Sequence, residues 1–443
     1  MASPTLPLEL LQKIIDDLDV TSLEDYLTLC TFSLVGRPFS YLCQKRIFQD
    51  VKLSYSFSWH ESGKLVLSDS AGIAGTKTTG HLFRDLLASS PHLAILIRSL
   101  TISVSGNLPA SHHDPGPSSA ADSFSLYDIL PRLQNLEAFM IAFQFYQISR
   151  PWNATEERTQ SLFKDIIPRV SRLDLSIFEG LPTSLFSDCP KLKELHAPFL
   201  FTDSDNISPP PAVKANIQVL EVQFQTQNAN PGVAFWSPAS NSPFSFSHLR
   251  SLKLSRAICS PSQIDELLLL CSGALEELDL HSRLPEDIQN LAKLRKLRRL
   301  RLHPKISGGN GMFLYNSFPY ILTTLKTLPW SAFHPKQLAL TLQATVLAFP
   351  NSEAALPMTL FHGWSDVANF LTDSGVSPTL ANVDFVSKRP ESYPTGFKEV
   401  HVPLSEFTPI WEKNVNLRKM REEGRLTYRI EGYSWAPQFD WPL

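Results

Sequence analysis

The 443-residue sequence predicts an α/β solenoid, a parallel sheet with outer helices, that follows a small helical domain. Two observations predict this fold class. Three short helical patterns occupy residues 1–54, and a leucine pattern recurs through residues 96–310. Residues 55–95 between them are expected to be a linker with the first helical segment of the array. Residues 311–443 are expected to hold irregular repeats and a C-terminal cap, because a solenoid must cover its open end.

Three helices account for the first part of the chain. The first, LPLELLQKIIDDL, repeats apolar residues at helical spacing up to Leu18. The second, LEDYLTLCTFSLV, follows Thr21 and Ser22, either of which suits a helix N-cap. The third, PFSYLCQKRIFQDV, starts at Pro38, which suits a first helical turn. About fifty residues bury too little surface for easy stability, so we expect this unit to pack against the next part of the chain or against a partner.

The first helix is apolar over an arc of about 160 degrees, wider than the stripe of about 100 degrees that a one-sided surface helix needs. Two sets of contacts would use that width. The set expected to close on the other two helices is Leu11, Ile15 and Leu18. The set expected to remain for a partner protein is Leu10 and Ile14, with Pro7 at the start.

A second pattern, L-x-x-L-x-L with conservative substitutions, starts eight times. The matches are IRSLTI at Ile97, LQNLEA at Leu133, VSRLDL at Val170, LKELHA at Leu192, IQVLEV at Ile217, LRSLKL at Leu249, LEELDL at Leu275 and LRRLRL at Leu297. Their intervals scatter around the 20 to 29 residues of a leucine-rich repeat, with helix-like segments and Pro-rich loops between them. The sequence therefore predicts an irregular leucine-rich-repeat array.

Composition excludes several classes of protein. The net charge is -3, with 40 basic and 43 acidic residues, so the chain lacks the basic balance typical of nucleic-acid binding. The N-terminus has no signal peptide pattern, and no apolar run is long enough to cross a membrane. We expect a soluble cytoplasmic or nuclear protein that contacts neither nucleic acid nor membrane. The five scattered cysteines are expected to be reduced.

Two short stretches resemble chemical sites and are rejected. GIAGTKT, from Gly72 to Thr78, lacks the adjacent glycine and lysine of a phosphate-binding loop. SHHDPG places His112, His113 and Asp114 on a Pro-rich loop, which does not fix a metal geometry. No nucleophile or zinc-protease motif occurs either. We therefore expect no enzyme, no cofactor and no metal.

The basic run KLRKLRRLRLHPK suggests a phosphate-binding stripe in isolation, but the repeat register favours another interpretation. Alternation along a strand places Arg299, Arg301 and His303 in one row on the concave sheet face. Residues of the two preceding repeats fall on the same face, namely Lys253, Glu277, Asp279 and His281. We expect Glu277 to face Arg299, Asp279 to lie between Lys253 and Arg301, and His281 to lie beside His303. Nucleic-acid binding remains the minority interpretation.

From Leu6 to Leu53 the sequence resembles an F-box. The specific features are the Leu6-Pro7-x-Glu9 opening, the spacing of the following Ile and Leu residues, and SLVGRPF where the family usually has S-L-V-C-R-x-W. Gly36 thus stands at the common cysteine and Phe39 at the common tryptophan. With the repeats downstream, the whole chain resembles the fungal receptors that join an F-box to leucine-rich repeats.

The resemblance implies a non-catalytic substrate-recognition subunit of an SCF-type E3 ubiquitin ligase. The F-box would dock a Skp-type adaptor and, through it, a cullin-RING ligase, while the repeats bind a target protein. The implied adaptor contacts are Leu6, Pro7, Glu9, Leu10, Ile14, Leu34, Val35, Arg37 and Phe39. The expected target contacts are Lys253, Glu277, Asp279, His281, Arg299, Arg301 and His303, helped by a loop with Phe235 and Trp236. The alternatives are a leucine-rich-repeat scaffold without ligase linkage and, third, an enzyme with a dispersed site.

Overall fold

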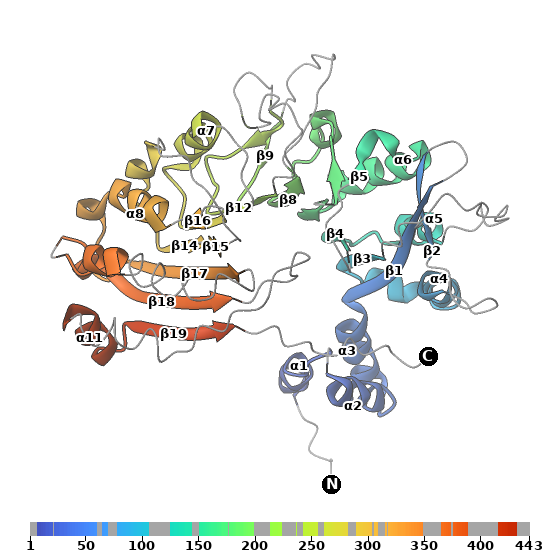
Figure 1. The fold of residues 1–443 in the computed structure, drawn as a ribbon. Helices are drawn as coiled ribbons and strands as arrows, with labels where there is room; N and C mark the ends of the chain where they lie inside the picture. Colours follow the sequence, from blue (N-terminus) through green and yellow to red (C-terminus); the bar gives the residue numbers. More distant parts are fainter. Residues whose placement is uncertain are drawn as a thin grey trace, which may run out of the picture. The chain divides into compact units, whose positions relative to one another are not determined.

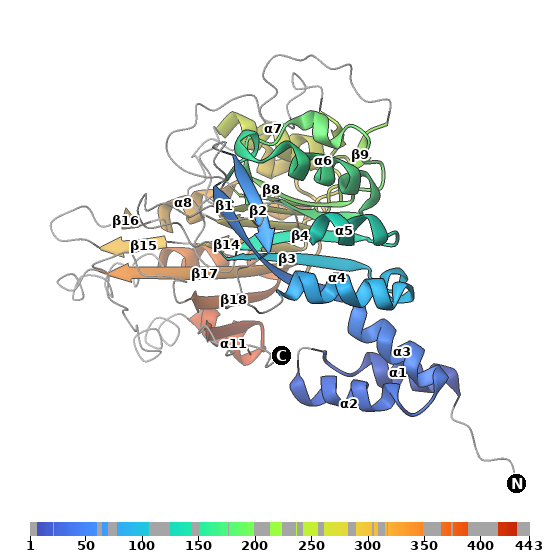
Figure 2. The same ribbon diagram turned by 90° about the vertical axis from the view of Figure 1, so that its right-hand side faces the viewer.

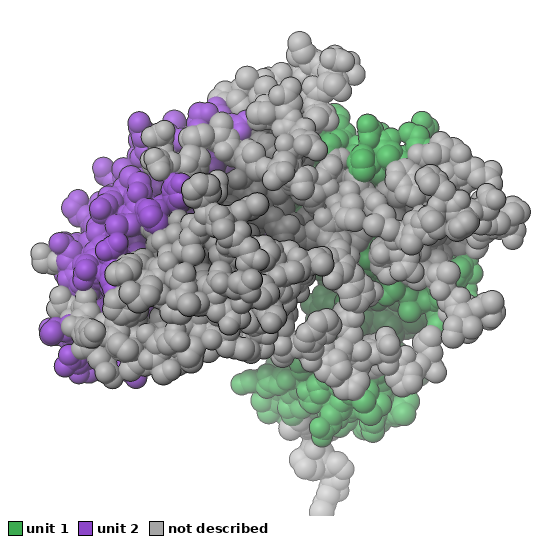
Figure 3. All heavy atoms as spheres, viewed as in Figure 1, with its two compact units in different colours: residues 1–215 green, residues 216–443 purple. Residues whose placement is uncertain are grey.

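The computed structural model describes most of the chain in separate ranges. These are residues 7–20, 22–59, 64–69, 78–105, 125–143, 150–175, 177–198, 213–223, 236, 242–255, 261–281, 289–303, 305–308, 315–316, 318–348, 365–373, 375–388 and 415–431. The chain divides into two compact units, Met1–Ala215 and Asn216–Leu443 (Figure 3). Each unit is described by itself.

Three helices open unit 1, as the sequence predicts. They are α1 (Leu8–Asp16), α2 (Leu23–Ser33) and α3 (Arg37–Phe48). Figure 2 shows them packed side by side, apart from the helices that accompany the sheet. Their shared core is formed by Ile15, Leu29, Leu42 and Cys43, with Leu11, Leu18, Val20, Phe32, Phe39 and Ile47 packed against it. This small core is what fixes the three helices to one another.

The ends of these helices differ slightly from the sequence prediction. Pro7 is the N-cap of α1, one residue before the first turn, and its carbonyl accepts the N–H groups of Leu10 and Leu11 at 3.1 Å. Ser22 caps α2 and accepts the N–H of Asp25 at 3.5 Å, whereas Thr21 lies outside the described residues. The Arg46 guanidinium donates to the carbonyl of Leu18 and so ties α3 to the end of α1.

The sheet of unit 1 follows directly on α3. Its strands are β1 (Asp50–Trp59), β2 (Leu65–Asp69), β3 (Ser99–Ser105), β4 (Ala138–Phe143), β6 (Arg172–Asp174) and β8 (Glu194–Pro198). They lie in the order β8-β6-β4-β3-β1-β2, and every pair in that order is parallel except β1 with β2. The parallel sheet thus begins at Asp50, well before residue 96 where the repeats were expected to start.

Short helices connect these strands. They are α4 (Thr79–Ser89), α5 (Leu126–Ile129), α6 (Glu157–Ile166) and the 3-10 turns η1 (Pro91–Ile95), η3 (Leu130–Arg132), η4 (Trp152–Ala154), η5 (Ile167–Arg169) and η6 (Thr183–Phe186). The two-residue strands β5 (Arg150–Pro151) and β7 (Phe178–Glu179) pair with each other. Strand followed by helix is the order that a parallel sheet requires.

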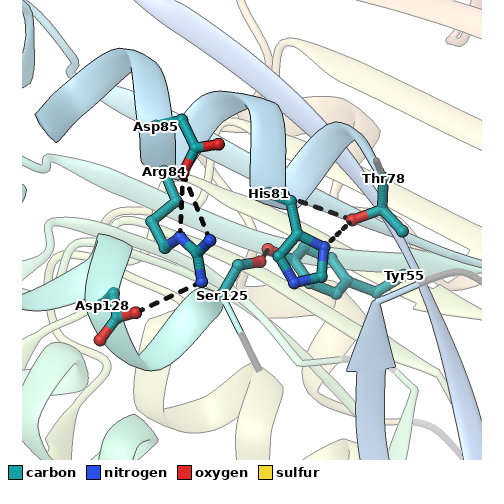
Figure 4. Close-up of polar contacts among 7 residues, drawn as sticks. All are labelled: Tyr55, Thr78, His81, Arg84, Asp85, Ser125 and Asp128. Atoms are coloured by element: carbon teal, nitrogen blue, oxygen red, sulfur yellow. Dashed lines mark hydrogen bonds and ion pairs between the residues drawn. The ribbon is translucent and has the colours of Figure 1, made fainter. Parts of the chain in front are cut away.

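Polar contacts lie around α4, and the ion pair of Arg84 with Asp128 at 3.9 Å links it to α5 (Figure 4). The Tyr55 hydroxyl and the Ser125 Oγ lie 3.0 Å apart, and both residues are fully buried. Thr78 Oγ1 accepts the backbone N–H of His81 at 3.3 Å and lies 2.8 Å from Nδ1 of the same ring. Thr78 therefore caps α4, which gives the last residue of the rejected glycine-rich stretch a structural role.

The strand register corrects one of the eight leucine matches. Ser99 pairs with Ala138, which places Leu136 opposite Ile97, and Leu133 lies in the turn before the strand. The repeat therefore starts at Leu136, three residues later than predicted. Both leucines are buried, and the Leu-x-x-Leu spacing continues upstream of the strand, so the sequence pattern alone fits either start. The other seven matches coincide with strands at the predicted register.

Unit 2 holds the remaining strands. They are β10 (Val219–Gln223), β12 (Ser251–Ser255), β13 (Glu277–His281), β14 (Arg299–His303), β15 (Lys305–Gly308), β16 (Tyr315–Asn316), β17 (Leu338–Ala348), β18 (Leu380–Lys388) and β19 (Leu426–Glu431), with two-residue strands β9 (Ala215–Asn216) and β11 (Phe244–Ser245). The order is β16-β15-β17-β14-β13-β12-β10, with β18 beside β17 and β19 beside β18. All these pairs are parallel except β15 with β16. The parallel sheet thus continues past residue 310.

The helices of unit 2 include α7 (Pro261–Cys271), α8 (Phe318–Thr327) and α11 (Val415–Glu422), with 3-10 turns η8 (Asn290–Lys293), η9 (Trp330–Ala332) and η10 (Ser377–Thr379); residues 365–371 are helical as well. Figure 1 shows α7 and α8 on the outer side of the strands. Alternate strand residues form the core, among them Leu278, Leu280, Leu300 and Leu302, all at most 3% exposed. The residues between them face away from this core. The predicted α/β solenoid-like architecture, a large and mainly parallel sheet with helices, is confirmed.

None of the helices in the described ranges combines the length and apolar character that crossing a bilayer requires. The three Pro-rich loops of the sequence, including His112, His113 and Asp114, fall mostly or wholly outside those ranges.

Candidate functional site: an apolar helical surface and a polar sheet face

Exposed apolar side chains gather on the three-helix domain. Of the fourteen large hydrophobic side chains that are exposed among the described residues, eight belong to α1, α2, α3 and the turn between α2 and α3. We call them the apolar surface; they are Leu8, Leu10, Ile14, Leu23, Leu27, Leu34, Val35 and Tyr41. Single exposed apolar residues are common, but so many within about forty residues make this domain a candidate interaction site.

Helix α1 presents its apolar residues to two sides, as the width of its arc predicts. Ile15 is 2% exposed, and it packs in the core with Leu11 and Leu18 beside it. Leu10 is 50% exposed and Ile14 47%. The same helix therefore closes the domain with one side and leaves a second apolar side uncovered.

The turn from α2 to α3 is the most exposed part of the apolar surface. Leu34 is 86% exposed and Val35 65%. Gly36 follows in an extended conformation with φ 173°, and a Cβ at this position would meet no atom within 4 Å. Neither the available space nor the backbone conformation therefore requires a glycine here. In the family that the sequence resembles, a cysteine is common at this position.

Phe39 is half-buried and packs against the core of the domain. Its ring packs against the core of the domain, with the Phe32 ring at 6.1 Å between centroids and an interplanar angle of 61°. It lies three and four residues before Leu42 and Cys43, which puts it on the inner side of α3. Phe39 thus contributes to the packing of the core, which a helical wheel of α3 could have shown, and its adaptor contact stays a prediction.

The other predicted adaptor contacts on these helices are exposed. Pro7, Glu9 and Arg37 all lie at the surface, whereas Leu6 is outside the described residues. Four exposed apolar residues were not predicted as adaptor contacts, namely Leu8, Leu23, Leu27 and Tyr41. The available signal was the α2 sequence LEDYLTLCTFS, which carries apolar residues all around the helix although only Leu29 is fully buried.

The second candidate surface is the side of the unit 2 sheet that faces away from its leucine core. We call Glu221, Lys253, Glu277, Asp279, Arg299, Arg301 and His303 the polar sheet face. Neighbouring strands pair in matching register, Lys253 with Asp279, Glu277 with Arg299, and Asp279 with Arg301. The predicted alignment of these residues is therefore confirmed.

The ion pairs on the polar sheet face follow the prediction in part. Glu277 Oε1 lies 2.5 Å from Arg299 Nη1, and Asp279 Oδ2 lies 3.3 Å from Arg301 Nη1. Lys253 is different, because its Nζ lies 2.7 Å from Glu221 Oε1 on β10. The register gives Lys253 a carboxylate on either side, and the Asp279 carboxylate is already engaged by Arg301 and His303. This explains why Lys253 turns to Glu221.

The two histidines lie side by side in the strand register. His281 and His303 are register partners, as expected. The His303 ring, however, bonds to Asp279, with Nε2 2.7 Å from Oδ1, and the side chain of His281 lies outside the described residues.

Cross-strand pairs of the same kind occur in unit 1. Arg172 pairs with Glu194 at 3.3 Å, and His196 Nδ1 lies 3.6 Å from the Asp174 carboxylate, while Arg98 pairs with Glu137 at 2.9 Å one residue before β3 and β4. Cross-strand pairing of opposite charges thus occurs in each unit among the described residues. A partner that binds there must either break these ion pairs or recognise the arrangement of the paired charges.

Trp236 does not belong to either surface. It is 2% exposed, and its Nε1–H donates to the carbonyl of Gln263 in α7 at 2.9 Å. The expectation that it helps to hold a target is therefore wrong, since the indole is core. Phe235 lies outside the described residues.

The described residues offer binding surfaces more than chemical groups. No group of three or more His, Cys, Asp or Glu side chains is placed to hold a metal within the described ranges. Burial raises the pKa of the Cys189 and Cys271 thiols to about 12, which keeps them protonated and weakly nucleophilic.

Comparison with known proteins adds no relative. No family model matches the chain, and no curated protein matches it.

Proposed function

We propose that the chain is the substrate-recognition subunit of an SCF-type E3 ubiquitin ligase in the cytoplasm or nucleus. It would perform no chemistry itself. The three-helix domain would dock a Skp-type adaptor, which links it to the cullin-RING ligase, and the repeat sheet would hold a target protein. Target lysines would thereby come close to a ubiquitin-charged enzyme supplied by the complex.

The apolar surface is the observation that carries this proposal. Burying a leucine or isoleucine side chain contributes about 1.5 to 3 kcal/mol, and association costs about 4 to 15 kcal/mol before any gain. Leu10, Ile14 and Leu34 offer three such anchors, and the other members of the surface add more. A domain that only capped the sheet would have no reason to leave these side chains in water.

The F-box-like sequence features fit this surface. The turn in SLVGRPF carries Leu34 and Val35, the most exposed apolar residues of the domain. Pro7, from the Leu-Pro-x-Glu opening, fixes the start of α1 and thereby the direction of Leu10. The two departures from the family pattern are compatible with the fold, because Gly36 has open space around it and Phe39 fills the core.

The target is proposed to bind the polar sheet face of unit 2. Arg299 and Glu277 are its most accessible charges, with side chains 73% and 43% exposed. Changing Glu277→Arg alone should weaken capture of a target, while the exchange of both charges, Glu277→Arg with Arg299→Glu, keeps an ion pair but inverts the pattern. Loss of capture in both variants with unchanged adaptor binding supports the assignment. Unchanged capture in both removes it.

Co-purification with a Skp-type adaptor tests the function. Wild-type chain should carry the adaptor, and Leu10→Asp with Ile14→Asp should lose it while the repeat sheet stays folded. A matched control is Leu269→Asp with Leu270→Asp, at two exposed apolar residues of α7 in unit 2, which should retain it. A scaffold without ligase linkage would not carry the adaptor at all. An enzyme would show turnover by the purified chain alone.

A further inference from the structure

The strand register divides the basic run KLRKLRRLRLHPK into two sets of cations. Leu294, Leu297, Leu300 and Leu302 are buried, and Arg299 and Arg301 face carboxylates across the sheet. The cations that precede β14 take no part in these cross-strand ion pairs. They are Lys293, Arg295, Lys296 and Arg298, all exposed. In the described ranges no carboxylate forms an ion pair with any of them. The target-binding surface proposed above does not use this second set.

A neighbouring turn extends the same charge. The turn before β17 carries Lys336, which is exposed and has a left-handed backbone with φ 54°. β14 and β17 are adjacent parallel strands (Figure 1), so the turns that precede them lie at one edge of the sheet. Residues 289–303 and 330–343 contain no Asp or Glu at all. We call Lys293, Arg295, Lys296, Arg298 and Lys336 the basic edge.

Hydrogen bonds fix the shape of the basic edge. The Gln337 side-chain amide donates to the carbonyls of Arg295 at 3.1 Å and Leu297 at 2.9 Å, which links the two turns. The Arg298 N–H donates to the carbonyl of Glu276 on the adjacent repeat at 2.7 Å. The backbone that presents the cations is therefore preorganised, and binding there need not order a loop first.

Two described carboxylates of the preceding repeat do not pair with the basic edge. Asp265 accepts the backbone N–H of Asn290 at 2.6 Å and its side-chain amide at 2.7 Å. Glu276 is the register neighbour of Arg298, yet it is half-buried and forms no ion pair with it. Among the described residues, no carboxylate therefore compensates the positive charge of the edge, on a chain whose net charge is -3.

We propose that the basic edge binds a short acidic segment, rich in Asp and Glu, of a partner protein. Guanidinium groups bind carboxylates through two parallel hydrogen bonds, and Arg295 and Arg298 supply such groups. The patch spans two adjacent turns only, and the rest of the chain carries the excess of negative charge. A long polyanion such as nucleic acid would extend past the patch onto that acidic remainder, whereas a short segment would not.

Binding can be measured on the full chain alone, so it succeeds or fails separately from the adaptor-docking function. The probe is a fluorescent peptide of eight glutamates, followed by anisotropy at low ionic strength and again with added salt. The test variant is Arg295→Glu with Lys296→Glu and Arg298→Glu. The matched control reverses three exposed cations of unit 1, Arg132→Glu with Lys191→Glu and Lys193→Glu, and changes the net charge equally.

The wild type should bind the peptide, and the test variant should bind at least about tenfold more weakly, since three exposed ion pairs each contribute a factor of about two to three. The control should stay within about twofold of wild type. The neutral variant Arg295→Gln with Lys296→Gln and Arg298→Gln guards against misfolding and should also lose binding. The proposal is overturned if the wild type does not bind, if test and control variants weaken equally, or if single-stranded DNA of the same charge binds more tightly than the peptide.

Discussion

Asp279 on β13 holds His303 and Arg301 on β14 at once, with Oδ1 2.7 Å from His303 Nε2 and Oδ2 3.3 Å from Arg301 Nη1. Its side chain is 16% exposed and that of His303 11%, so this part of the polar sheet face is shielded from solvent. Glu277, two residues earlier on the same strand, is 43% exposed and pairs with an arginine that is 73% exposed. The two carboxylates should therefore contribute unequally to stability.

Replacing Asp279→Asn should lower the free energy of unfolding by about 1 to 2 kcal/mol, because a charged hydrogen bond in a shielded position is lost. Glu277→Gln should change it by less than about 0.5 kcal/mol, since exposed pairs are screened by solvent. Urea unfolding followed by circular dichroism measures both. Equal changes in the free energy of unfolding for both variants would show that the shielding of Asp279 does not contribute to stability.

Removing the cap of α4 should destabilise unit 1. In Thr78→Ala the hydroxyl that accepts the His81 N–H is lost, at a cost of about 0.5 to 2 kcal/mol. Thr78→Ser keeps the hydroxyl and should retain most of the stability. Hydrogen exchange in the first turn of α4 is the readout, and protection that is unchanged in the alanine variant would argue against a capping role.

The buried thiols should resist alkylation in the folded protein. Burial raises the pKa of Cys189 and Cys271 to about 12 and also raises that of Cys43, so these groups stay protonated at neutral pH. Of the four cysteines in the described ranges, the partly exposed Cys30 should react first with iodoacetamide, as read by peptide mass spectrometry. In denaturant all should react. Rapid native labelling of Cys271 would contradict its burial.

The same pKa shifts predict that the stability of the folded state decreases as the pH rises. A thiol whose folded pKa is raised favours the folded state fully below the unfolded value of about 8.5, and that contribution declines as pH rises from there toward about 12. Unfolding midpoints should therefore fall above about pH 9 and recover in part in Cys189→Ala with Cys271→Ala. A fall of equal size in that variant would assign the pH effect to other groups.

Two glycines should respond differently to alanine. Gly36 has an extended backbone with open space around it, so Gly36→Ala should change stability by less than about 0.5 kcal/mol, as the gain in chain stiffness and the weaker N-cap offset each other. Gly424 has φ +67°, and Gly424→Ala should cost about 1 to 2 kcal/mol from backbone strain. Thermal unfolding compares them, and a reversed order would contradict this conformational argument.

Periodic patterns predict local structure in this chain well. The spacing of α1 separates Ile15, which is buried, from Leu10 and Ile14, which are not. The alternation of β13 and β14 predicts that Glu277 faces Arg299. These relations depend only on the helical and strand periods, which the sequence contains directly.

Choices between equivalent partners could not be predicted in the same way. Lys253 has a carboxylate on each side, and which of them it pairs with depends on the bond between Asp279 and His303. Leu133 and Leu136 are both buried, and only the strand pairing shows which one begins the repeat. Trp236 lies in a Pro-rich stretch that suggests a surface loop, yet its ring packs beside α7. Such outcomes depend on tertiary packing rather than on local pattern.

Direct titration of the full chain with a Skp-type adaptor, by isothermal calorimetry, tests the central claim that α1–α3 form an adaptor-docking domain. The account predicts one-to-one binding with a Kd of about 1 μM or tighter, and at least about tenfold weaker binding for Leu34→Asp. Ile95→Asp, at a comparably apolar residue of η1 that is 58% exposed, should bind as the wild type does. Absence of binding by the wild type, or equal binding by the Leu34→Asp variant, would contradict it.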